Sequence, residues 1–339
     1  MIDLNAIWFL LVGVLIIGYA ILDGFDLGVG ILHLFTNDET EKRKNFNAIG
    51  PVWDGNEVWL LTGGGALFAA FPIVYATVFS GFYLALMLLL AALIFRAVSF
   101  EFRSKVESPA AKKIWDTAFG VSSFLIALLL SVAFGNILGG VPIDAKGTYT
   151  GSFFSLLDPY SVLVGLLGVA LFVMHGAIYM AMKSDGPQRQ RMVTTANALW
   201  MAVIVLYFVD TLATFFFAHY LFDGMLSNPL FWVLIIALLG AAAYIPVGLK
   251  GEKFGLTFTA SSIVIASMIG LSAVSLFPRL VPSNIDLANS LTIYNASSSQ
   301  YTLNAMLIIA LIGVPIVLGY TIFIYRVFKG KVVLSEDSY

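Results

Sequence analysis

Carboxylates inside long apolar stretches are the residues of this sequence whose types and spacing suggest chemistry. Asp23 and Asp26 lie three residues apart in one such stretch, and therefore on one face of a helix. Asp54 and Glu57 repeat this spacing in the next stretch, and Asp210 stands alone further along the chain. An ionisable side chain within a bilayer is costly, so each of these acids is a candidate for function.

The two acid pairs are expected to cluster in one half of a membrane. Arg96 ends the third apolar stretch and Glu101 follows it, and both lie on the same side in the orientation derived below. A series of acids from the surface to mid-membrane is what a proton uptake route requires. Structural roles stay open as well. Asp54 or Glu57 could interact with the positive N-terminus of a helix, and Asp23 or Asp26 could pair with Arg96 or with a partner subunit.

Histidine, cysteine and methionine offer little for metal or haem chemistry. The sequence has no cysteine, and its 10 methionines show no ligand spacing. A transmembrane haem with two histidine ligands needs them to face each other at matched depth. His33, His175 and His219 are predicted at three different depths, so we expect no haem and no metal ligated by this chain alone.

Composition places the chain in lipid. Of its 339 residues, 60% are hydrophobic and 11% charged, with a mean hydropathy of +0.93. Soluble globular domains carry about 25% charged residues. The net charge of −2 gives no basic surface for a nucleic acid, which is excluded as a partner.

Nine apolar stretches are long enough to cross a bilayer, which needs about 20 apolar residues per span. They are continuous, not alternating, which indicates helices and not a barrel. We therefore predict an all-α polytopic membrane protein, a single integral-membrane domain over 1–339. Its predicted parts are a four-helix bundle over 4–138, a second over 160–277 and a ninth helix over 303–328. The predicted spans are 4–34, 53–71, 74–96, 114–138, 160–182, 192–218, 228–250, 255–277 and 303–328.

Basic residues give the orientation. Fifteen of the 18 lysines and arginines fall after the first, third, fifth and seventh spans or after the last, and only Lys146 and Arg279 fall in the opposite loops. The positive-inside rule then predicts an N-terminus outside and a C-terminus in the cytoplasm. The outer loop 278–302 is long for this chain, and such loops are often functional or serve in docking.

Several segments together carry a resemblance to a known family. They are Asp23-Gly24-Phe25-Asp26-Leu27-Gly28, Trp53-Asp54-Gly55-Asn56-Glu57-Val58-Trp59, Gly64-Gly65-Ala66-Leu67-Phe68-Ala69-Ala70-Phe71-Pro72, Phe95-Arg96, Phe100-Glu101-Phe102-Arg103-Ser104-Lys105 and Ala133-Phe134-Gly135-Asn136. With these segments the sequence closely resembles subunit II of the cytochrome bd-type quinol oxidases, over essentially the whole chain.

The resemblance implies a heterodimer in the bacterial plasma membrane that oxidises quinol, reduces dioxygen to water and takes protons from the cytoplasm. Haems b and d would belong to subunit I, and this chain would hold no catalytic residue. The implied partners are that haem-bearing subunit, membrane lipid, quinol and dioxygen. The resemblance also allows a small accessory transmembrane subunit and a structural quinone in this chain.

Roles for individual residues also follow from the resemblance. It assigns Asp54 to a proton path toward the haem subunit, with Asp23 and Asp26 matching the first-helix motif. We extend this predicted path to Glu57 and Glu101, with Arg96 as a supporting charge. Trp59 is expected to serve dioxygen access or packing.

Two other classes of protein remain open at this point. A proton-coupled secondary transporter would also carry embedded acids, although broken helices around a mid-membrane binding site are expected there. A purely structural assembly subunit would use every acid for packing. The subunit composition and the redox spectrum of the purified complex discriminate among the three.

Overall fold

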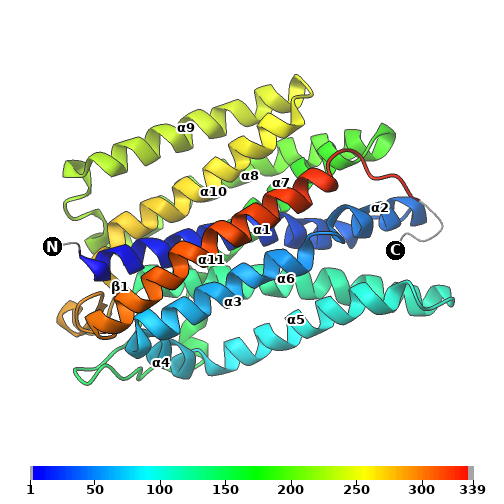
Figure 1. Ribbon diagram of the computed structural model, residues 1–339. Helices are drawn as coiled ribbons and strands as arrows, with labels where there is room; N and C mark the ends of the chain where they lie inside the picture. The colour runs from blue at the N-terminus through cyan, green and yellow to red at the C-terminus, as the bar shows by residue number, and fades with distance from the viewer. Residues whose placement is uncertain (1–2, 335–339) are drawn as a thin grey trace.

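The computed structural model describes residues 3–334, and long helices running side by side make up most of it (Figure 1). The long helices are α1 (Leu4–His33), α3 (Trp53–Ala70), α5 (Tyr83–Arg103), α6 (Pro109–Gly139), α7 (Pro159–Lys183), α8 (Gly186–Phe217), α9 (Pro229–Lys250), α10 (Phe254–Leu276) and α11 (Gln300–Val327). The short ones are α2 (Glu39–Ile49), α4 (Pro72–Gly81), η1 (Phe154–Leu157), η2 (His219–Phe222), η3 (Met225–Ser227) and η4 (Leu287–Asn289).

The all-α membrane fold is confirmed. Within residues 3–334, eight helices are long and apolar enough to cross a membrane. Helix α3, the predicted span 53–71, is not among them, because its 18 residues include an acidic first turn and a run of glycines.

The prediction of one continuous helix over 74–96 is wrong. Helix α4 ends at Gly81 and α5 begins at Tyr83, and α5 continues to Arg103.

The connecting segments gather at the two ends of the helices (Figure 1). One end, which we name the basic end, holds α2 and the segments 104–108, 184–185, 251–253 and 328–334. The other, which we name the loop end, holds the start of α1, α4 and the segments 140–158, 218–228 and 277–299. The predicted loops therefore alternate between the two ends as the sequence requires. Helix α2, which the sequence analysis did not predict, lies at the basic end.

Side-chain caps explain where several helices begin. Asp3 accepts hydrogen bonds from the backbone amides of Asn5 and Ala6 at the start of α1. Asp158 does the same for α7, whose first residue is Pro159, a position where proline costs no hydrogen bond. At the other end of a helix, Gly140 with φ 78° follows the last residue of α6.

The long outer loop is ordered against the start of α1. It contains a short antiparallel pair of strands, β1 (Arg279–Val281) and β2 (Leu291–Thr292). Asn5 donates a hydrogen bond to the carbonyl oxygen of Ile293 at 2.6 Å, and the Trp8 indole donates to that of Leu303 at 2.9 Å. The loop and the first turn of α11 thus fix the start of α1, the helix that carries the first acid pair.

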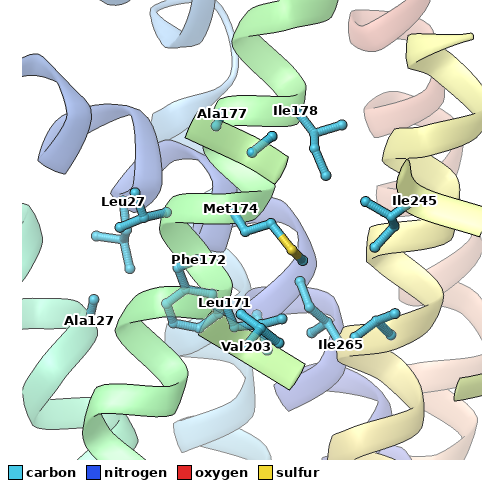
Figure 2. Close-up of a cluster of buried hydrophobic side chains, with 14 of the residues drawn as sticks. Leu27, Ala127, Leu171, Phe172, Met174, Ala177, Ile178, Val203, Ile245 and Ile265 are labelled. Carbon is cyan, nitrogen blue, oxygen red and sulfur yellow. The ribbon is translucent and has the colours of Figure 1, made fainter. Parts of the chain in front are cut away.

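Helix α7 lies at the centre of the largest apolar core (Figure 2). Its Met174 and Ile178 are buried with Leu27 of α1, Ile245 of α9 and Ile265 of α10. Because α7 packs against α1, α6, α8 and α10, it joins the two predicted four-helix bundles. The division into bundles over 4–138 and 160–277 stays a prediction.

Helices α1 and α7 cross with their backbones in contact. A Cβ atom on Gly28 would lie 2.0 Å from the carbonyl oxygen of Phe172, and one on Gly176 would lie 2.6 Å from the carbonyl carbon of Gly28. Only glycine permits such an approach, since the atoms in the way belong to the backbone and cannot rotate aside.

Gly28→Ala is therefore expected to destabilise the protein by about 3 kcal/mol, the upper part of the usual range for overpacking. Thermal unfolding of the purified complex measures this. Gly13→Ala in the same helix is the matched control, because no atom lies within 4 Å of its added Cβ. Equal melting temperatures for the two variants would contradict the close crossing.

Candidate functional site

Arg96 is the centre of a buried ionic cluster between α1, α3 and α5. Its side chain is 1% exposed, and it binds both carboxylate oxygens of Asp23, with Nη2 to Oδ1 at 2.7 Å and Nη1 to Oδ2 at 3.1 Å. Nη1 also donates to Oε1 of Glu57 at 2.9 Å. One guanidinium thus joins carboxylates from two other helices, in the bidentate geometry that arginine favours.

Asn56 connects this region to Asp26 and to α11. Its amide nitrogen donates to Oδ2 of Asp26 at 2.7 Å and to the carbonyl oxygen of Leu22 at 3.0 Å. The Tyr325 hydroxyl of α11 donates to its amide oxygen at 3.1 Å. Asn56 therefore satisfies polar groups from two helices, and a hydrophobic residue in its place would leave them unpaired.

Three buried polar atoms beside these contacts have no hydrogen-bond partner within residues 3–334. They are Oδ1 of Asp26, the Tyr19 hydroxyl and Nε of Arg96. Buried polar atoms are nearly always paired with protein or with ordered water. All three atoms lie beside the two α1 carboxylates and their partner Arg96.

The sequence-predicted residues separate into two groups. Asp23, Asp26, Glu57 and Arg96 meet in the region just described, together with Asn56. Asp54 and Glu101 do not join them. Asp54 lies exposed in the first turn of α3, and Glu101 lies exposed near the end of α5, with Lys105 at 3.8 Å.

The local sequence explains this geometry. A spacing of three residues offsets two side chains by about 60° around any helix axis. Both α1 carboxylates are buried despite this offset because α1 is buried on all sides from Asp23 to His33, whereas α3 is buried on one side only. Glu57 thus reaches Arg96 with its side chain 22% exposed, while Asp54 faces outward. The expectation that Arg96 ends its span is wrong, because α5 continues seven residues further, to Arg103.

Aromatic rings close the cluster on its basic-end side. The Trp53 ring lies 6.0 Å from the Arg96 guanidinium carbon and stacks on Phe100 at 5.2 Å. Trp59 instead covers Gly18 of α1, where an added Cβ would lie 2.2 Å from the indole. Packing of α3 on α1 therefore explains this glycine, and a role of Trp59 in dioxygen access stays a prediction.

A second ionic cluster at the basic end was missed by sequence reasoning. Asp116 of α6 accepts from Arg103 Nε at 2.5 Å and from Lys42 Nζ at 2.8 Å, and its Oδ1 lies 2.9 Å from His33 Nε2. Arg103 also binds both carboxylate oxygens of Glu39 in α2. In the sequence, this cluster could have been sought from Asp116, a lone carboxylate near the start of the predicted span 114–138.

The other two histidines and Asp210 lie apart from both clusters. His175 is fully buried, with Nδ1 at 2.7 Å from Ser261 Oγ and Nε2 at 3.1 Å from the carbonyl oxygen of Ile21. His219 is exposed at the loop end. Asp210 is buried in α8, and within the described residues its Oδ1 has no partner. Over the same residues, no three His, Cys, Asp or Glu side chains are grouped to hold a metal ion.

Comparison with known proteins agrees with these motifs. Residues 4–328 match the family described as cytochrome bd terminal oxidase subunit II. The Escherichia coli K12 protein named cytochrome bd-I ubiquinol oxidase subunit 2 is 38% identical over 367 residues, which cover 98% of this chain and 96% of that one. The Bacillus subtilis cytochrome bd ubiquinol oxidase subunit 2 is 37% identical over 342 residues, 99% of both chains.

The fold is also that of a solved structure. A chain in the structure of bd oxidase from Geobacillus thermodenitrificans superposes with a TM-score of 0.81 at 17% identity, covering 96% of this chain and 99% of that one. Both the nearly full-length family match and the relatives at more than a third identity lead to one assignment. The chain belongs to the family of cytochrome bd terminal oxidase subunit II.

Proposed function

We propose that this chain is the subunit without haem in a quinol oxidase that reduces dioxygen to water, and that it supports the haem-bearing subunit and carries protons toward it from the cytoplasm. The observation that supports this most directly is the graded burial of its acids. Asp54 is exposed, Glu57 is partly exposed, and Asp23 and Asp26 are fully buried. Such a series offers successive proton-binding groups at the cytoplasmic half of the membrane.

The outward face of α3 is the surface we assign to the partner subunit. Asp54 shares this face with Val58, Leu61 and Phe68, all well exposed. An exposed carboxylate on a helix within a membrane needs a polar partner, and within residues 3–334 Asp54 has no hydrogen bond or ion pair. A second subunit docked on α3 would supply that partner and receive the proton.

The three histidines of this chain do not fit as axial ligands of the haems that the complex would hold. Both ring nitrogens of His175 have partners, from α1 and α10. His33 Nε2 is engaged by Asp116, and His219 lies exposed at the loop end, the opposite end from His33. Residues so placed do not fit a pair of axial ligands on one haem. Quinol oxidation and dioxygen reduction are therefore assigned to the partner.

The orientation proposed for the complex places the basic end in the cytoplasm of a bacterium. Fifteen lysines and arginines at or near that end support it by the positive-inside rule. The route from Asp54 inward then begins on the side from which protons are taken up.

The proposal is tested by purifying the complex through a tag on this chain. We expect a haem-bearing second subunit in the mass spectrum, haem bands in the reduced-minus-oxidised spectrum, and quinol-dependent oxygen consumption. Proton uptake from the cytoplasmic side is measured in vesicles of known orientation. A chain that purifies alone and transports a solute with protons would contradict the proposal and favour the transporter.

A further inference from the structure

A cavity at the basic end is lined by lysine side chains, and within residues 3–334 no carboxylate lines it. It has a volume of about 310 Å³ and lies between the end of α2, the start of α3, the end of α7 and the segment after α11. Lys183, Lys329 and Lys331 line it, with Tyr179, Tyr325 and Pro51 among the other lining residues. Tyr325 also contacts Asn56 beside the Arg96 cluster, whereas the three lysines of the cavity make no contact with that cluster and have no part in the function proposed above.

Lys183 is held in place within this cavity. It is 9% exposed, and its Nζ donates to the carbonyl oxygen of Phe328 at 2.6 Å and lies 5.6 Å from the Tyr179 ring. The backbone amide of Val332 donates to the Lys183 carbonyl at 2.9 Å, which fixes the C-terminal segment against α7. An ammonium has three donors, so Lys183 retains two for another ligand.

The charge of the cavity is not balanced by the chain as described. Within residues 3–334, no carboxylate lies within 4.0 Å of the Nζ of Lys183, Lys329 or Lys331. Asp185 interacts with Lys331 over a longer distance and is paired with Lys44 at 3.0 Å. Lys183 is buried, whereas Lys329 and Lys331 are exposed at the rim. A buried ammonium without a counter-charge is unfavourable, and an anion in the cavity would offset that cost for Lys183.

We propose that this cavity binds a phosphate group, and that an anionic phospholipid headgroup supplies it. The cavity lies at the end of the bundle that would meet the headgroup layer, and basic pockets at that level recognise phosphate headgroups. Its volume suits a phosphate with its glycerol and not a whole lipid. Binding would add further contacts to the segment after α11, because Lys329 and Lys331 both belong to it.

The test uses the delipidated complex and measures affinity by calorimetry and stoichiometry by native mass spectrometry. The probes are dioctanoyl phosphatidylglycerol, dioctanoyl phosphatidylcholine and inorganic phosphate. We expect one tight phosphatidylglycerol, bound about 30-fold more weakly by the K329Q/K331Q variant, as the loss of two lysines near a headgroup predicts. The matched control K113Q/K250Q removes two exposed lysines of the same end outside the cavity and is expected to bind like the wild type.

The outcomes separate the two sources of phosphate. If phosphatidylglycerol binds tightly and inorganic phosphate binds weakly, the site is assigned to a lipid. If inorganic phosphate binds tightly and phosphatidylglycerol weakly, it is assigned to free phosphate. Either assignment also requires that K329Q/K331Q weakens the binding. Equal weakening in K113Q/K250Q, or no binding by the wild type, overturns the proposal. If E336Q/D337N binds and the wild type does not, the chain's own acids Glu336 and Asp337 neutralise the lysines, and the proposal is again overturned.

Discussion

Replacing Arg96 with leucine is expected to lower the free energy of unfolding of the complex by about 3–5 kcal/mol, as the loss of one partner of a buried ion pair does. Asp23 is fully buried and loses both hydrogen bonds that Arg96 gives it. Glu57 loses its bond as well. The measurement is thermal or denaturant unfolding of the purified complex, followed together with its yield from the membrane.

A double substitution distinguishes the net contribution of the ion pair to stability from the cost of leaving one buried charge unpaired. Asp23→Leu alone leaves Arg96 short of its main acceptor, whereas Asp23→Leu with Arg96→Leu removes both charges and should recover part of the lost stability. Arg96→Lys is expected to fall between, because an ammonium cannot reproduce the two parallel bonds to Asp23. A wild-type melting temperature for Arg96→Leu would show that the cluster does not hold α1, α3 and α5 together.

Asp54→Asn is expected to slow quinol-dependent oxygen consumption by about 100-fold, the low end of what a positioned proton-transfer group contributes. The side chain is exposed in the first turn of α3 and makes no hydrogen bond within residues 3–334, so its loss should not disturb the fold. Oxygen consumption and proton uptake are measured on complexes matched for haem content.

The controls for Asp54 distinguish proton transfer from structure. Asp54→Glu keeps a carboxylate and should retain most of the activity. Glu107→Gln removes an exposed carboxylate at the same end and should leave turnover unchanged. Full activity and full proton uptake in Asp54→Asn would remove the role from this residue. Loss of haem from the same variant would instead show that Asp54 holds the partner subunit in place.

Much of the fold could be predicted because bilayers impose simple rules on sequence. Long apolar runs indicated the helices, and the distribution of lysine and arginine indicated which loops share an end. Prediction from the sequence was wrong at two places. At Gly81 and Phe82 an apolar stretch is broken into two helices without any charged residue, and at Arg96 a charged residue lies inside a helix. A lone arginine is expected at the edge of a span, but pairing with Asp23 allows α5 to continue past it.

The candidate site was only partly predictable for a similar reason. The sequence by itself determined that this chain is a helical membrane protein and that Asp23, Asp26, Asp54 and Glu57 lie in its first two apolar stretches. Only the tertiary structure decided that Arg96 pairs with Asp23, that Asp54 faces outward, and that Tyr325 reaches Asn56 across 269 positions. Hydropathy is a local property of a segment, whereas the rotation of each helix about its axis is set by side chains packed from distant parts of the chain.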